Sequence, residues 1–156
     1  GVRLPGTNQR AAIDPSTLKL RLYPLPDEDA APRRLVATSR GQISYVDYSR
    51  GFLGHLDPDT GAIREWPAPS GASSGPYAMA VDHLDRIWFV ETGEAPNHLV
   101  GFSTKTATFI SVTRIPSGAG SVRHMIFDAG SGAIWFGTDY NKIGRATVTP
   151  PRQQGE

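Results

Sequence analysis

Short apolar runs separated by polar turns recur at a regular interval along the chain. Three of these runs begin at Ile43, Ile87 and Ile134, which lie 44 and 47 residues apart. A second phrase, which ends on proline, keeps nearly the same interval and closes at Pro26, Pro69 and Pro116. Several phrases that recur together at about 45 residues are typical of an internal repeat.

The middle repeat indicates four short strands. Residues rich in Val, Ile, Phe, Trp and Thr occupy positions 78–82, 87–91, 99–102 and 107–115, and polar turn residues separate them. The turn at His83-Leu84-Asp85 is short enough to make a tight hairpin of the first two strands. In the preceding repeat the corresponding last turn is DPDTG, in which Gly61 can supply the positive φ that such a turn needs. Each repeat is therefore predicted to be an antiparallel meander.

Meanders of this size must stack to bury both faces. Four strands per repeat of about 45 residues predict an all-β fold, a β-propeller built of four-stranded antiparallel blades. The predicted blades span residues 1–31 (partial), 32–75, 76–121 and 122–148, and 149–156 is expected to be a disordered tail. Aromatic residues of the second strands are expected to wedge between blades, namely Tyr45, Trp88 and Trp135.

The number of blades has a consequence for association. The chain of 156 residues holds about three and a half blades, whereas propellers usually have four to eight. We therefore expect the C-terminal part of a larger propeller, or two copies that associate. An open blade face is the expected surface for self-association.

Composition narrows the classes of partner. The 16 basic and 15 acidic residues nearly balance, which argues against nucleic acid and against an anionic membrane surface as partners. The absence of cysteine excludes disulfides, thiolate metal sites and cysteine nucleophiles. No apolar run approaches the roughly 18 residues of a membrane helix.

Polar residues gather where the first strand of each hairpin begins and the second ends. Since both positions lie at one edge, three pairs are expected around a central funnel: Arg33 or Arg34 with Asp47, Tyr77 with Glu91, and His124 with Asp139. A ring of carboxylates there would suit Mg²⁺ or Ca²⁺, and a histidine beside them could act as a general base. The alternative is that these positions are polar only because they are hydrated. His55, His83 and His98 are expected to be surface or loop residues.

Three stretches resemble one known family. The segments PYAMAVDHLDRIWFVET, GAIWFGTDYNKIGRATV and IREWPAP are similar to the repeat of the virginiamycin B lyase (streptogramin lyase) family, and the likeness runs from Asn8 onward. The resemblance implies a seven-bladed propeller and a carbon–oxygen lyase that opens the ring of streptogramin B antibiotics by elimination at the ester, which confers antibiotic resistance. It also implies Mg²⁺ and a histidine base.

The resemblance assigns roles to particular residues. It implies His124 as the base, with Asp139 and Tyr77 completing the catalytic positions, and Glu91 and Asp139 as metal ligands. Tyr77 stands where the family has a second histidine, and Val122 where it has a glutamate. Counting back from Trp135 places His124 at the catalytic position, whereas alignment on Asp128 places Arg123 there.

Two other functions stay open. One is a propeller that only binds a small molecule in its funnel, for which Arg33, Arg34 and Arg123 would favour an anion. The other is a sugar-acid lactonase of the six-bladed type, which would need an Asn-Asp-Glu metal cage that the sequence does not place. Export signals in bacterial relatives favour a periplasmic or secreted location over a cytoplasmic one.

Overall fold

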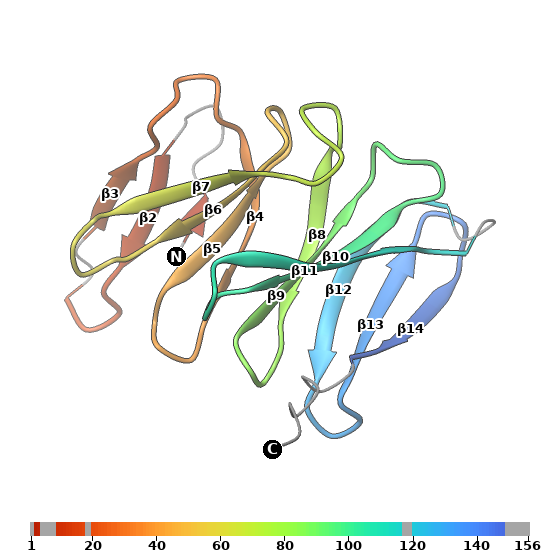
Figure 1. The fold of residues 1–156 in the computed structure, drawn as a ribbon. Coiled ribbons are helices and arrows are strands. Elements are labelled where there is room, and N and C mark those ends of the chain that lie inside the picture. Colours follow the sequence, from red (N-terminus) through yellow and green to blue (C-terminus); the bar gives the residue numbers. More distant parts are fainter. Residues whose placement is uncertain (1, 4–8, 18–19, 117–119, 149–156) are drawn as a thin grey trace, which may run out of the picture.

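The computed structural model describes residues 2–3, 9–17, 20–116 and 120–148. Within these ranges the chain forms four antiparallel sheets and no helix (Figure 1). The predicted tail, 149–156, lies outside the described residues. Because the described part contains no helix, it also contains none that could cross a membrane. The all-β prediction is therefore confirmed.

Each sheet is a meander in which strands consecutive in sequence are neighbours. The first sheet holds β1 (Val2–Arg3), β2 (Gln9–Ile13) and β3 (Leu20–Pro24). The second holds β4 (Pro32–Ala37), β5 (Ile43–Asp47), β6 (Phe52–Leu56) and β7 (Ile63–Pro67). The third holds β8 (Pro76–Val81), β9 (Arg86–Glu91), β10 (His98–Ser103) and β11 (Thr108–Arg114). The fourth holds β12 (Val122–Asp128), β13 (Ala133–Thr138) and β14 (Ile143–Thr147).

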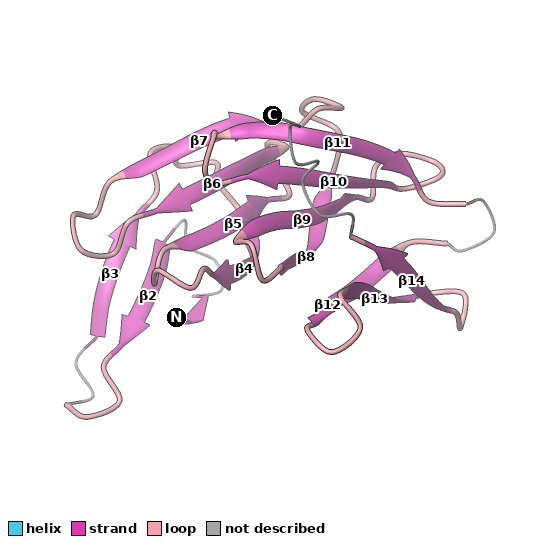
Figure 2. Ribbon diagram, turned by 60° about the horizontal axis from the view of Figure 1, so that its bottom comes forward, coloured by secondary structure: helices cyan, strands magenta, loops and turns pink. Residues whose placement is uncertain are grey.

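The sheets follow one another along an arc, with their first strands together on its inner side. Strand β8 contacts both β4 and β12. In Figure 2, β4 and β8 lie on one side of the arc, and β7 and β11 lie on the opposite side. The first strands of the second, third and fourth sheets therefore lie together on the inner side of the arc, and the ends at which they begin form one rim.

The hairpin of β8 and β9 is closed by a buried aspartate. Asp82 accepts hydrogen bonds from the backbone N–H groups of Leu84 and Arg86, and Asp85 completes the turn at a φ of 56°. The Asp82 carboxylate also pairs with the Arg86 guanidinium at 2.6 Å and accepts from Trp88 Nε1 at 2.9 Å. One carboxylate thus fixes the predicted turn and the position of the tryptophan.

Three apolar clusters hold the sheets together. Trp88 is buried against Val122, Met125 and Ile134 of the fourth sheet. Phe89 belongs to a second cluster, which joins the second and third sheets. A third cluster lies where the chain passes from the first sheet to the second, and its buried members are Leu25, Ala30 and Tyr45.

Tyr45 and Trp88 are both buried between sheets, as predicted, but they lie on opposite faces of their strands. Counted from the isoleucine of each repeat, the residue equivalent to Trp88 and Trp135 is Ser44, not Tyr45. Tyr45 is buried on the opposite face of its strand, in the cluster toward the first sheet. A shift of one residue along a strand exchanges the two faces, and this accounts for the difference. Trp135 is 36% exposed, because no described sheet follows the fourth.

Aromatic rings pack closely against glycines of the third strands. Tyr45 faces Gly54, Trp88 faces Gly101 and Phe136 faces Gly144 across the ladder. A Cβ at Gly54 would lie 2.0 Å from Tyr45 Cζ, and one at Gly144 would lie 2.1 Å from Phe136 Cζ. Because glycine has no side chain, these positions provide the space that the rings occupy.

Candidate functional site: the arginine-lined rim

A hollow of about 330 Å³ lies at the rim where the first strands begin. We call it the rim hollow, and its lining residues are Arg33, Tyr48, Tyr77, Thr92, Ser121 and Arg123. They come from equivalent places in three sheets: the start of a first strand, the residue directly before it, or the residue after a second strand. The repeat of the fold therefore brings these residues together at one rim.

Bulges at the start of the first strands place three of these side chains. The pairing with the second strand shifts between Pro32 and Arg34, between Pro76 and Met79, and between Val122 and His124. The residues at the shifts include Arg33, Tyr77 and Arg123, which have no partner in the ladder and line the rim hollow. An extra residue of this kind redirects a side chain.

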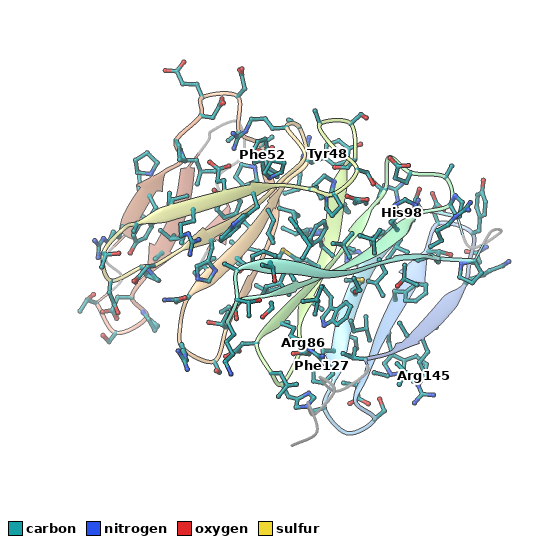
Figure 3. All side chains as sticks on the ribbon, viewed as in Figure 1. Tyr48, Phe52, Arg86, His98, Phe127 and Arg145 are labelled. Carbon is teal, nitrogen blue, oxygen red and sulfur yellow. The ribbon has the colours of Figure 1, made fainter. Side chains whose placement is uncertain are left out.

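Arginine and tyrosine side chains contact one another around this hollow. The Arg33 guanidinium lies 5.6 Å from the Tyr48 ring centre, and the Tyr48 and Tyr77 rings meet edge to face at 6.1 Å. Arg34 lies over the Tyr77 ring and donates to its hydroxyl at 3.3 Å. Tyr48 lies in the turn that directly follows β5 (Figure 3). These contacts hold the aromatic rings and the cations in one cluster.

The carboxylates of the predicted ring bind backbone instead. Asp47, Glu91 and Asp139 each accept a hydrogen bond from the N–H of the segment that leads into their sheet, from Ala31, Ser70 and Ser121 respectively. Asp47 also pairs with Arg50 at 2.6 Å, and Glu91 also accepts from the Ser70 hydroxyl. Asp47 and Glu91 are fully buried. The three carboxylates therefore tie the connections between sheets to the ends of the second strands.

The structure separates the predicted site residues. Tyr77 lines the rim hollow, and Asp139 lies next to it, with its carboxylate 3.4 Å from the Arg123 guanidinium. His124 instead lies with Ile126, Trp135 and Ile143 on the outward side of the fourth sheet. No hydrogen bond or ion pair between described residues joins His124 to Asp139 or Glu91. Of the two registers that the sequence left open, alignment on Asp128 describes the rim, because Arg123 lines the hollow.

The carboxylates and histidines of the described residues are not gathered into one cluster. No group of three or more His, Asp or Glu side chains in the described ranges is close enough to hold a metal ion. Both Glu91 oxygens accept hydrogen bonds from Ser70, and Asp139 accepts from Ser121 and Arg123. The metal-binding role of Glu91 and Asp139 therefore stays a prediction.

The sequence predictions omit two rim residues that directly follow the second strands, and they place His98 in a loop. Tyr48 and Thr92 follow Asp47 and Glu91 directly, so the repeat alignment could have found them as a pair of equivalent positions. His98 begins β10 instead of lying in a loop, and its Nδ1 is 3.3 Å from the Glu91 carboxylate (Figure 3).

Comparison with known proteins gives the fold. No family model matches the chain, and no curated protein matches its sequence. Among solved structures, virginiamycin B lyase from Staphylococcus aureus superposes with a TM-score of 0.73 at 21% identity, over 93% of this chain and 50% of that one. A protein provisionally assigned as a 6-phosphogluconolactonase, from Bacteroides uniformis, gives a TM-score of 0.69 at 12% identity, over 90% of this chain and 44% of that one.

A third likeness is to the extracellular domain of a provisionally assigned one-component system from Bacteroides thetaiotaomicron. Its TM-score is 0.65 at 18% identity, over 91% of this chain and 18% of that one. The chain thus spans half the length of the lyase, and less than half the length of each of the other two proteins. At these identities the likenesses establish architecture, and the chain is identified as part of a β-propeller.

Proposed function

We propose that the chain is the ligand-binding part of a propeller whose rim hollow takes a small anion, with an aromatic or other flat apolar group favoured. One observation carries the proposal: two arginines line a hollow that has no carboxylate among its lining residues. Guanidinium groups bind carboxylates and phosphates in a fork geometry, and tyrosine rings offer flat apolar surface beside them.

The charges around the hollow support an anion over a cation. Arg33 forms no ion pair with any described residue, and Arg123 contacts Asp139 only at 3.4 Å, where both side chains are solvent-accessible. An exposed pair of this kind is weak and yields easily to a ligand carboxylate. The nearby buried carboxylates, Asp47 and Glu91, are engaged with backbone N–H groups and are not among the residues that line the hollow.

The test compares ligands that differ only in charge. Benzoate and phenyl phosphate are titrated into the protein by isothermal calorimetry, with benzyl alcohol and benzylamine as the neutral and cationic counterparts. We expect binding of the anions alone, and a loss of about tenfold or more in affinity for Arg33→Gln with Arg123→Gln, because hydrogen bonds to charged groups are worth about 1.5–3 kcal/mol. Arg145→Gln, on the outward side of the fourth sheet, is the control. Equal affinity in the double variant, or no binding of either anion, overturns the proposal.

A second candidate is elimination that opens a cyclic ester, supported by the likeness to virginiamycin B lyase. Against it, the residues that line the rim hollow supply arginine, tyrosine, serine and threonine but no histidine. Incubation with a streptogramin B and Mg²⁺, with and without EDTA, tests it by mass spectrometry. A product of unchanged mass that is lost with EDTA and with His124→Ala would favour the lyase. Unchanged substrate is the result expected from the binding proposal.

A further inference from the structure

A second hollow, of about 260 Å³, lies between the second and third sheets and shares no residue with the rim hollow. We call it the inter-sheet hollow. Among its lining residues are Gln42, His55, Asp57, Arg64, Trp66 and Phe102. Neither the repeat pattern nor the proposed function accounts for this set of polar side chains between two packed sheets.

The hollow exists because the second sheet departs from the repeat. In the third sheet, Trp88 lies on Gly101 and fills the space toward the fourth sheet. In the second sheet the same two positions hold Ser44 and His55. The serine is far smaller than a tryptophan, so the indole volume is missing on this face.

The side chains around this space are organised by hydrogen bonds. His55 Nδ1 lies 3.1 Å from Ser44 Oγ, and its Nε2 contacts the Gln42 amide oxygen. Because that oxygen can only accept, Nε2 carries the proton and Nδ1 accepts from the serine hydroxyl. Burial and the Arg64 charge lower the pKa of His55, in keeping with a neutral ring. The histidine is thus a fixed, uncharged wall of the hollow.

An acidic and a basic side chain, Asp57 and Arg64, both line the hollow, and no ion pair joins them. One Asp57 carboxylate oxygen, Oδ1, accepts from the Asp59 N–H at 2.9 Å, which leaves Oδ2 for a ligand. Arg64 lies over the Trp66 ring at 4.9 Å, and Trp66 in turn packs against Phe102 with ring centres 4.8 Å apart. A separated cation and anion beside an aromatic wall complement a zwitterion that carries an apolar group.

We propose that the inter-sheet hollow binds a free α-amino acid with an apolar side chain. Arg64 holds the carboxylate, Asp57 holds the ammonium group, and the side chain lies against Trp66. Arginine suits a carboxylate because its donors form a planar fork. The site is independent of the rim hollow, so each can be tested without the other.

The ligand test uses L-leucine and two compounds that each lack one charged group. Calorimetry compares L-leucine with 4-methylpentanoate, which lacks the ammonium, and with 3-methylbutylamine, which lacks the carboxylate; L-phenylalanine tests a larger side chain. We expect binding of an amino acid and a loss of about tenfold or more when either charge is missing. The proposal is overturned if neither amino acid binds. It is also overturned if 4-methylpentanoate or 3-methylbutylamine binds as tightly as L-leucine.

Variants locate the site. Arg64→Gln and Asp57→Asn each change a solvent-accessible charge and should lower the affinity by about tenfold or more. Arg145→Gln is a matched control, because Arg145 also lies over a tryptophan ring, at 5.7 Å from Trp135. The double variant Ser44→Trp with His55→Gly restores the pair seen in the third sheet and should fill the hollow and abolish binding. Amino-acid binding that survives Arg64→Gln and Asp57→Asn overturns the assignment.

Discussion

His55 owes its charge state to its neighbours. The sequence places it at a strand position that holds Gly101 and Arg145 in the other repeats, and this variety predicts a surface residue. In the structure it is half buried, with both ring nitrogens in hydrogen bonds. Burial is the main cause that lowers its pKa, Arg64 adds to the effect, and Asp57 opposes it. The difference between the prediction and the structure arises from Ser44, whose small side chain lets the imidazole turn inward.

The lowered pKa predicts a pH-dependent stability. The unfolded chain takes up a proton on His55 near the ordinary pKa of about 6.5, whereas the folded chain does so only at lower pH. Protonation therefore favours unfolding, and the free energy of unfolding should fall as the pH drops below about 6.5. Urea denaturation at about pH 7.5 and about pH 5.5 measures the change. His55→Gln should reduce it, and His83→Gln, at an exposed turn, serves as the control. An equal pH dependence in the wild type and His55→Gln would contradict the prediction.

Within the second, third and fourth sheets, the contact between a ring and a glycine holds the second and third strands together. The alternation of the sequence predicts these strands well, because β-branched and aromatic residues fill them. It does not predict which aromatic lies on which glycine, since that depends on the register of the pairing. The bulge at Arg123 is likewise not predicted by the alternation. Its extra residue changes which face each later side chain lies on, and the prediction for His124 assumes an unbroken alternation.

The tight contact at Gly54 predicts a large effect of one methyl group. In Gly54→Ala, the new Cβ would lie 2.0 Å from Tyr45 Cζ, and the Tyr45 ring is fully buried and has no space into which to retreat. We expect the free energy of unfolding to fall by about 1–3 kcal/mol or more, the range of overpacked cores.

Gly137→Ala is the control for this substitution, since no atom lies within 4 Å of a Cβ built at Gly137. Its effect should stay within about 0.5–1 kcal/mol. Urea denaturation of both variants at one pH gives the comparison. Equal losses of stability would mean that the ring over Gly54 moves aside without cost, contrary to the prediction.

For the molecule as a whole, the repeat predicts the stacking of the sheets but not what lies on the outer face of the last one. A repeat that contacts only its neighbours carries no information about its free side. That side of the fourth sheet, the open face, presents Ile126, Trp135 and Ile143 beside His124. Ile126 is 64% exposed and Ile143 is 82% exposed. Contiguous apolar side chains of this kind are a candidate association surface.

The open face predicts self-association of the chain. Sedimentation velocity over a range of protein concentrations should reveal a concentration-dependent dimer or larger species. Ile126→Lys with Ile143→Lys should shift the equilibrium toward the monomer by about tenfold or more, because two charges would face an apolar partner surface. Val112→Lys, on the fourth strand of the third sheet, is the control at an exposed apolar position. A wild-type chain that stays monomeric at every concentration would contradict the prediction.

The bulges at the rim separate the side chains that line the hollow from those that hold the sheets together. Arg33, Tyr77 and Arg123 lie where the pairing with the second strands shifts, while buried carboxylates of other residues secure the connections between the sheets. Exchanging a side chain at a bulge leaves the ladder and these anchors intact. If the rim hollow binds a ligand as proposed, its preference could diversify in evolution by single substitutions at these three positions, and the same positions are the place to randomise a library for new specificities.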